Sequence, residues 1–194
     1  DITINGGDIS VVSKDDGINI SGGVDKSSVG GRPGENHMAG NGGLLHITGG
    51  KIYVNSLGDG IDSNGKVIID GGEVIVDGPT NSDNGALDYD SSFEVNGGEL
   101  YAVGSSGMSQ NVSGGNQNTI MFNLGNTYSG MISILCDDEL VLSFEPSKKY
   151  SSVVVSSNLL KRGKKYSIEI NDKEVASIKV SSIVNTYGRK KGGR

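Results

Sequence analysis

The chain has few of the residues that build most compact protein cores. Its 194 residues include no Trp, three Phe, three Pro and a single Cys, Cys136. One Cys excludes a disulfide within the chain. No apolar run approaches the ~20 residues of a membrane-spanning helix, so we expect no membrane span. The hydrophobic fraction is 34%, and the Leu- and Ala-rich 3.6-residue periodicity of a helical bundle is missing.

Glycine is the abundant residue, with 32 of the 194 positions, more than twice the usual ~7%. The absence of a G-X-Y period excludes collagen, and the low Pro content favours an elongated β fold with tight turns. Charge is unevenly distributed, because residues 1–118 hold 16 acidic and 5 basic side chains while residues 119–194 hold 7 and 12. The acidic first part argues against nucleic acid as a partner and favours cations.

An internal repeat organises residues 1–118. A Gly-Gly pair follows an apolar-x-apolar-x segment and precedes an x-apolar-x-apolar segment. Successive pairs are 22 and then 26 residues apart from Gly49 onward, which is the length of one turn of a three-sided parallel β-helix. A Gly-rich insertion over residues 22–43 lengthens the first repeat. The pairs are Gly6-Gly7, Gly49-Gly50, Gly71-Gly72 and Gly97-Gly98.

Alignment of the repeats gives columns of apolar residues of similar volume, as the core of a repeat protein requires. The positions between them are mostly polar, which is the period-2 alternation of strands with one wet face. We therefore expect an all-β fold, a right-handed parallel β-helix over residues 1–118. The columns are Ile2/Leu45/Val67/Phe93, Ile4/Ile47/Ile69/Val95, Ile9/Ile52/Val74/Leu100, Val11/Val54/Val76/Ala102 and Ile18/Ile61/Leu87/Met108.

Residues 119–187 follow another pattern. Six strand-like segments, TIMFNL, MISILC, ELVLSF, SSVVVS, KYSIEI and VASIKV, alternate with turn residues such as Gly125-Asn126, Asp137-Asp138 and Gly163-Lys164. Because the end of a β-helix exposes strand edges and core, we expect these strands to form an antiparallel β cap. Residues 188–194 read as a basic tail. The chain starts in mid-pattern at Asp1, so we expect earlier repeats to have been removed.

Acidic and amide side chains also align between repeats. Equivalent positions of neighbouring strands lie about 4.8 Å apart, and carboxylates that close repel each other unless a cation lies between them. Oxygen ligands suit Ca²⁺, whereas zinc would need more than His37, His46 and Cys136. The alternative is that Asp and Asn serve only as turn residues. The candidate calcium ligands are Asp15, Asp16, Asn19, Asp59, Asp62, Asn84, Asp88 and Asp90.

A second candidate site is the row of outward positions after each Gly-Gly pair, which includes Tyr53 and Tyr101. Exposed tyrosine rings could stack on sugar rings, although ordinary cross-strand packing explains them equally well. The insertion carries Arg32, which could reach the acidic side from a long loop. These three residues are the candidate ligand-binding residues.

Extended motifs resemble one known family. The stretches GGDISVVSKDDGIN, GGKIYVNSLGDGIDSNG and GGEVIVDGPTNSDNGALDYD are similar to those of calcium-binding parallel β-helix carbohydrate-binding proteins on the surface of anaerobic bacteria. The resemblance covers residues 1 to about 112 and implies calcium ligands within 15–19, 59–62 and 85–90. It also implies binding to cellulose and polygalacturonate, without established lyase activity. Because Ser106-Gly107-Met108 has no carboxylate, the metal row should end before it.

Three functions follow from these observations. We expect a binding protein, outside the cell or on its surface, that uses calcium to hold a plant cell-wall polysaccharide, polygalacturonate-like, cellulose or both. The alternative is a structural or adhesive surface protein that calcium only rigidifies. A pectate-type polysaccharide lyase is the third reading. It would need a base beside the metal row, and Arg32 is the one candidate within reach. The oligomeric state stays open.

Overall fold

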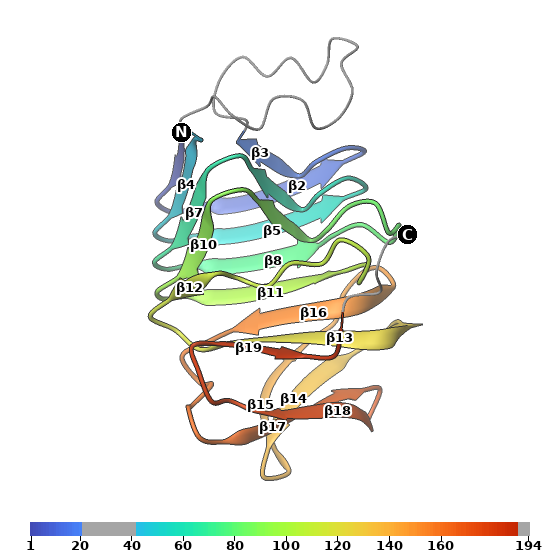
Figure 1. The fold of residues 1–194 in the computed structure, drawn as a ribbon. Helices are drawn as coiled ribbons and strands as arrows, with labels where there is room; N and C mark the ends of the chain where they lie inside the picture. Colours follow the sequence, from blue (N-terminus) through green and yellow to red (C-terminus); the bar gives the residue numbers. More distant parts are fainter. Residues whose placement is uncertain (21–41, 190–194) are drawn as a thin grey trace.

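The computed structural model describes residues 1–20 and 42–189, and these residues form 19 β-strands without a helix (Figure 1). The expected all-β class is therefore confirmed. Among the described residues no helix is long and apolar enough to cross a membrane. Most of the expected insertion over 22–43, and residues 190–194 of the basic tail, lie outside the described residues.

The strands of residues 1–118 lie in three sheets and pair in parallel with one another, and each of the first three repeats contributes one strand to each sheet. The first sheet holds β1 (Ile2–Ile4), β4 (Leu44–Ile47), β7 (Lys66–Ile69), β10 (Ser92–Val95) and β12 (Gly114–Gly115). The second sheet includes β2 (Asp8–Ser13), β5 (Lys51–Ser56), β8 (Glu73–Asp77) and β11 (Glu99–Gly104). The third sheet holds β3 (Ile18–Ile20), β6 (Ile61–Ser63) and β9 (Leu87–Tyr89). We call β1–β3, β4–β6 and β7–β9 the first, second and third repeat units.

The strand registers confirm the apolar columns. Ile2 pairs with Leu45, Leu45 with Val67, and Val67 with Phe93. From the second repeat unit on, the members of these columns are almost fully buried and form one hydrophobic core. The column of the third sheet is an exception at its last position. Met108 lies outside any strand and is 50% exposed, so its predicted place in the core is wrong. The third sheet has only three strands and ends at β9.

The corner between the first and second sheets depends on the second glycine of each pair. Gly7, Gly50, Gly72 and Gly98 have φ between 76° and 99°, a conformation that side chains with a Cβ rarely adopt. The corner therefore turns in the same way in every repeat unit and keeps the strands in register.

The second sheet continues into the C-terminal part of the chain. β16 (Tyr150–Ser156) pairs antiparallel with β11, and β13 (Thr119–Tyr128) pairs antiparallel with β16. β19 (Val184–Tyr187), which the sequence did not predict, adds in parallel to β13. The turn predicted at Gly125-Asn126 is also wrong, because β13 runs through these residues with a shift in register.

A four-stranded antiparallel sheet follows, in the order β15 (Glu139–Phe144), β14 (Ile132–Cys136), β17 (Lys165–Ile170) and β18 (Lys173–Lys179). Its hairpins turn at Asp137-Asp138, as predicted, and at Asn171-Asp172, with positive φ at all four residues. The sheet packs on the outer side of the second sheet, where Val103, Ile120, Phe122, Val153 and Val155 meet Ile132, Ile134, Tyr166 and Ile168 in a second core.

Candidate functional site

Three of the predicted calcium ligands lie in the strands of the third sheet, four lie in the turns that lead into these strands, and Asp90 follows β9. We call Asp15, Asp16, Asn19, Asp59, Asp62, Asn84, Asp88 and Asp90 the acidic column. Within it, Asn19 pairs with Asp62 between β3 and β6, and Asp62 pairs with Asp88 between β6 and β9. The predicted alignment of these three positions is confirmed.

The turn residues of the column touch the backbone of the following repeat unit. Asp16 Oδ1 accepts the N–H of Asp59 at 2.9 Å, and Asp59 Oδ1 accepts the N–H of Gly85 at 2.6 Å. Each carboxylate thus uses one oxygen to hold the next turn in place. The same contact explains Gly58, because a Cβ at this position would lie 2.5 Å from Asp16 Oδ1.

Amide groups bridge carboxylates of the acidic column. The Asn19 side-chain amide donates to Asp16 Oδ2 at 2.8 Å and to Asp62 Oδ2 at 2.7 Å. Gln110, which the sequence did not suggest as a partner, donates to Asp88 Oδ1 at 2.9 Å. One amide therefore joins two carboxylates that belong to successive repeat units.

The electrostatics of the column favour either protons or a cation. Partial burial and, after it, the negative charges of Asp16, Asp59, Asp88 and Asp90 together raise the pKa of Asp62 to about 7. Burial likewise raises the pKa of Asp59 to about 6, against the lowering effect of the Gly85 N–H. Ionised carboxylates at these positions are thus poorly compensated by the chain itself.

The donor set of the acidic column consists of carboxylate and amide oxygens, the ligands that Ca²⁺ prefers. Asp16 and Asp62 supply such oxygens from neighbouring repeat units, and both accept a hydrogen bond from the Asn19 side-chain nitrogen. Within residues 1–20 and 42–189, no group of three or more His, Cys, Asp or Glu side chains is arranged to hold a metal ion. A site here would therefore combine fewer carboxylates with amide or carbonyl oxygens and water.

The two candidate tyrosines lie in the predicted row, since Tyr53, Ile75 and Tyr101 pair across β5, β8 and β11. Both hydroxyls have partners in the chain. Tyr53 donates to Asp77 Oδ2 at 2.9 Å, and Tyr101 donates to Glu99 Oε2 at 2.9 Å. The Tyr101 ring also packs on Phe144, with 4.9 Å between ring centroids. The row belongs to the second sheet, whereas the acidic column belongs to the third.

A buried carboxylate that the sequence did not single out anchors the loop between β15 and β16. Asp77 is only 2% exposed and accepts the N–H of Ser147 at 2.9 Å in addition to the Tyr53 hydroxyl. Next to it, the Lys148 ammonium donates to the carbonyl of Ser56, and burial lowers the pKa of Lys148. The sequence offered one signal for Asp77. It is a charged residue at the end of β8, at a position where the paired residue in β11 is the apolar Val103.

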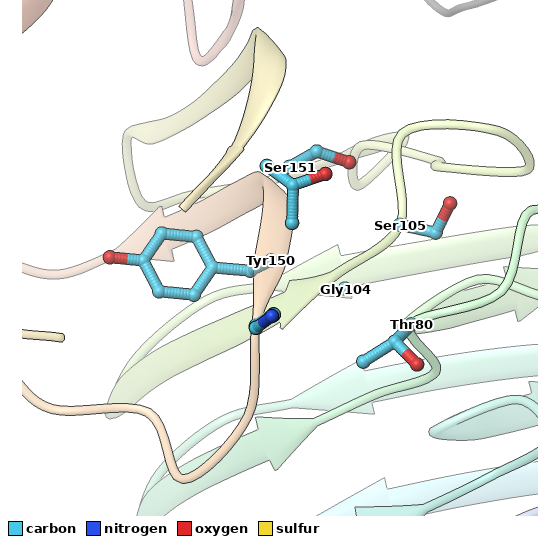
Figure 2. A pocket seen from close by; sticks show the side chains of 7 residues that line it. Thr80, Gly104, Ser105, Tyr150 and Ser151 are labelled. Atoms are coloured by element: carbon cyan, nitrogen blue, oxygen red, sulfur yellow. The ribbon is translucent and has the colours of Figure 1, made fainter. Parts of the chain in front are cut away.

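A small pocket lies where β11 meets β16. It has a cavity volume of about 20 Å³ and is lined by Thr80, Gly104, Ser105, Thr127, Lys149, Tyr150 and Ser151. Figure 2 shows the Tyr150 ring directed away from Thr80 and Ser105, and its hydroxyl donates to the carbonyl of Gly130. The pocket is smaller than the roughly 300–1,000 Å³ of most ligand sites.

The third candidate ligand-binding residue, Arg32, lies outside the described residues.

Comparison of the chain with protein families, with curated proteins and with solved structures finds no match. The arguments on function therefore rest on the acidic column and on the fold that positions it.

Proposed function

We propose that the chain is a right-handed parallel β-helix that binds Ca²⁺ along its acidic column and, through it, an acidic plant cell-wall polysaccharide outside the cell or on its surface. The fold part of the proposal is supported by three parallel sheets that each receive one strand per repeat unit. In this reading each repeat unit is one turn of the β-helix, and β13, β16 and β19 with the four-stranded sheet form its cap.

The observation that carries the proposal is the row of polar side chains in which Asp62 lies between Asn19 and Asp88 and is joined to Asp16 by the Asn19 amide. Burial and four neighbouring carboxylates raise the pKa of Asp62 to about 7 in this row. At neutral pH the ionised form of such a carboxyl group destabilises the folded chain unless the group takes up a proton or binds a cation. Asp16 and Asp62 would hold the cation, because one oxygen of each already lies within 2.8 Å of the Asn19 side-chain nitrogen. A half-turn of the Asn19 amide would direct its oxygen to the same place. Bound Ca²⁺ supplies the positive charge that a uronate carboxylate needs on an otherwise negative surface.

The chain contributes spacing and rigidity. The third sheet repeats its side chains about every 4.8 Å, and the backbone bonds from Asp16 and Asp59 to the following turns fix their orientation. A polymer with a charge on every sugar unit can meet a repeated site more than once, which raises its avidity. The contact of Tyr53 and Tyr101 with sugar rings stays a prediction. Both tyrosines lie on the second sheet, and the proposal does not depend on them.

Calorimetry tests the proposal. We expect Ca²⁺ to release or absorb heat on binding the wild-type chain, and the variant Asp62→Asn to bind it at least ~10-fold more weakly, because one ligand charge is lost. Asp172→Asn is the matched control, since it makes the same change in an exposed hairpin turn. Polygalacturonate should then bind in calcium and not in excess chelator. Failure of Ca²⁺ to bind, or equal affinity in both variants, would refute the calcium part.

A second candidate function, a structural or adhesive protein, is favoured by a specific observation. Asp16 and Asp59 already stabilise the next repeat unit through backbone hydrogen bonds, so calcium could serve rigidity alone. In that case Ca²⁺ would raise the melting temperature while neither polygalacturonate nor cellulose binds. A lyase would be recognised by growing ultraviolet absorbance of unsaturated uronate product during the same titration.

A further inference from the structure

A short basic loop leads into β17. Four of the five residues from 161 to 165 are Lys or Arg, in the order KRGKK. All four side chains are exposed, and clusters of this kind are typical of surfaces that bind anionic polymers. We call these five residues the basic loop. The calcium site does not use them, and β17 and β18 lie at the end of the molecule opposite β3 (Figure 1).

The backbone of the basic loop is fixed by the chain beneath it. Leu160 and Tyr166, on either side of the loop, are each 1% exposed. The N–H of Lys161 donates to the Tyr166 hydroxyl at 2.7 Å, and the N–H of Gly163 donates to the carbonyl of Val180 at 2.7 Å. The basic side chains therefore project from a preorganised backbone, which reduces the entropy lost when a partner binds.

Like charges face each other beside the loop. Lys165 in β17 pairs directly with Lys179 in β18. Both side chains are exposed on the outer face of the sheet, because the next residue, Tyr166, points into the core. Like charges placed directly opposite each other destabilise a sheet. In the described part of the chain neither lysine forms an ion pair, so an anion from outside would relieve the repulsion.

The other basic side chains of the loop differ in how they are compensated. Lys164 has a carboxylate partner, since its ammonium lies 3.1 Å from Asp137 Oδ2. Lys161 and Arg162 donate to backbone carbonyls at 2.6 and 2.8 Å, which orients these side chains without neutralising their charge. We call the basic face the four cations that have no carboxylate partner among the described residues, namely Lys161, Arg162, Lys165 and Lys179.

We propose that the basic face is a second contact surface for an acidic polysaccharide, whose carboxylates it binds directly and without calcium. The choice of a polysaccharide rests on the proposed function. Ammonium and guanidinium groups form charge-assisted hydrogen bonds with carboxylates. Ser167 and Ser177 pair with each other next to the two lysines of the face and add hydroxyl groups for the sugar. A polymer held here and at the acidic column gains avidity.

Nucleic acid and a second copy of the chain fit the basic face less well. Single-stranded nucleic acid binds where aromatic rings stack on its bases, and Tyr166, next to the loop, is buried. The major groove of DNA is commonly read by a helix, and the described residues form none. A second copy would offer its acidic column, where Asp16 and Asp59 already accept backbone N–H groups.

Titration with polygalacturonate at low ionic strength, in calcium and in chelator, tests the proposal. The double variant Lys165→Gln/Lys179→Gln should bind the polymer about 5-fold or more weakly than the wild type in both conditions, and with a weaker dependence on salt. The matched control Lys66→Gln/Lys173→Gln removes the same charge at two exposed positions elsewhere and should bind as the wild type does. At about 0.15 M salt, screening should make this contact alone too weak to measure in chelator.

Equal affinity of the two double variants at low ionic strength would overturn the proposal, and so would a wild-type chain that binds no polymer there. Tighter binding of a DNA oligonucleotide than of polygalacturonate would also overturn it, because the partner would then be nucleic acid. Self-association of the wild type that the variant Lys165→Gln/Lys179→Gln abolishes would do the same, since the occupant would then be a second copy.

Calcium titration without polymer separates this proposal from the proposed function. Ca²⁺ should bind the wild type and the variant Lys165→Gln/Lys179→Gln equally, because the acidic column is unchanged. If Ca²⁺ binds neither chain while the variant loses the binding seen in chelator, the proposed function fails and the basic face stands. The variant should melt at or above the wild-type temperature, because it lacks the repulsion between the two lysines. A lower melting temperature would contradict that repulsion.

Discussion

The stability of the chain without calcium should fall as pH rises through the range in which Asp62 ionises. The folded state raises the pKa of Asp62 from 3.8 to about 7, so the folded chain keeps a proton that the unfolded chain has already released. Stability due to this group is complete below pH 3.8 and is lost as pH rises to about 7.

The size of the effect follows from the pKa values. The rise from 3.8 to about 7 corresponds to at most about 4 kcal/mol. Water reaches part of the Asp62 side chain, so screening reduces our expectation to about 2 kcal/mol. Asp59 adds a smaller effect of the same sign, because its pKa is raised to about 6.

Urea unfolding in chelator, between about pH 4 and pH 8, measures this loss. Asp62→Asn cannot ionise and should lose about 2 kcal/mol less than the wild type over this range, whereas Asp172→Asn should follow the wild type. Added Ca²⁺ should flatten the wild-type curve, because it replaces the proton as the balancing charge. Identical pH slopes in Asp62→Asn and the wild type would refute the electrostatic reasoning.

Two further predictions concern the packing that holds the sheets together. Phe93→Ala leaves a cavity at a fully buried position of the hydrophobic core and should lower the free energy of unfolding by about 3–5 kcal/mol. The control Leu140→Ala, at a 62% exposed position, should change this free energy by less than about 0.5 kcal/mol. Equal losses of the two variants in thermal unfolding would contradict the core assignment. Asp77→Ala removes the carboxylate that accepts from the Tyr53 hydroxyl and the Ser147 N–H. It should lower the free energy of unfolding in urea by about 1–3 kcal/mol and speed amide exchange at Ser147. Unchanged exchange at Ser147 would show that Asp77 does not anchor the loop.

The periodic part of the fold could be predicted because its information is local. One Gly-Gly pair per repeat unit fixes the corner, and the period-2 pattern on either side decides which side chains face inward. Register between Ile2, Leu45, Val67 and Phe93 then follows from counting residues. The alignment of Asn19, Asp62 and Asp88 could be predicted for the same reason.

The parts that could not be predicted depend on contacts between distant segments. Met108 follows the local pattern, yet the third sheet ends at β9 and leaves this side chain exposed. β19 is too short and polar to stand out, and it becomes a strand by pairing with β13. Asp77 is buried because Ser147, 70 residues later, folds over it. No periodicity in the sequence predicts these long-range contacts.

Rows of polar side chains run along the first and the third sheet, and their electrostatics differ. On the first sheet, Thr48 donates to Asn5, and Asp70 accepts from His46 and Asn96, so donors match the single carboxylate. The hydrogen bonds from His46 and Asn96 lower the pKa of Asp70.

Along the third sheet the balance is reversed. There the Asn19 amide serves two carboxylates at once, and burial with four like charges raises the pKa of Asp62. The strands cannot move apart to relieve this repulsion, because the backbone bonds from Asp16 and Asp59 hold neighbouring turns together. A row of side chains that only stabilised the turns between strands would not need several carboxylates. The row on the first sheet shows this, because its one carboxylate, Asp70, is matched by hydrogen-bond donors. The surplus of carboxylates on a backbone that cannot relax is therefore the feature that argues for a cation at this sheet.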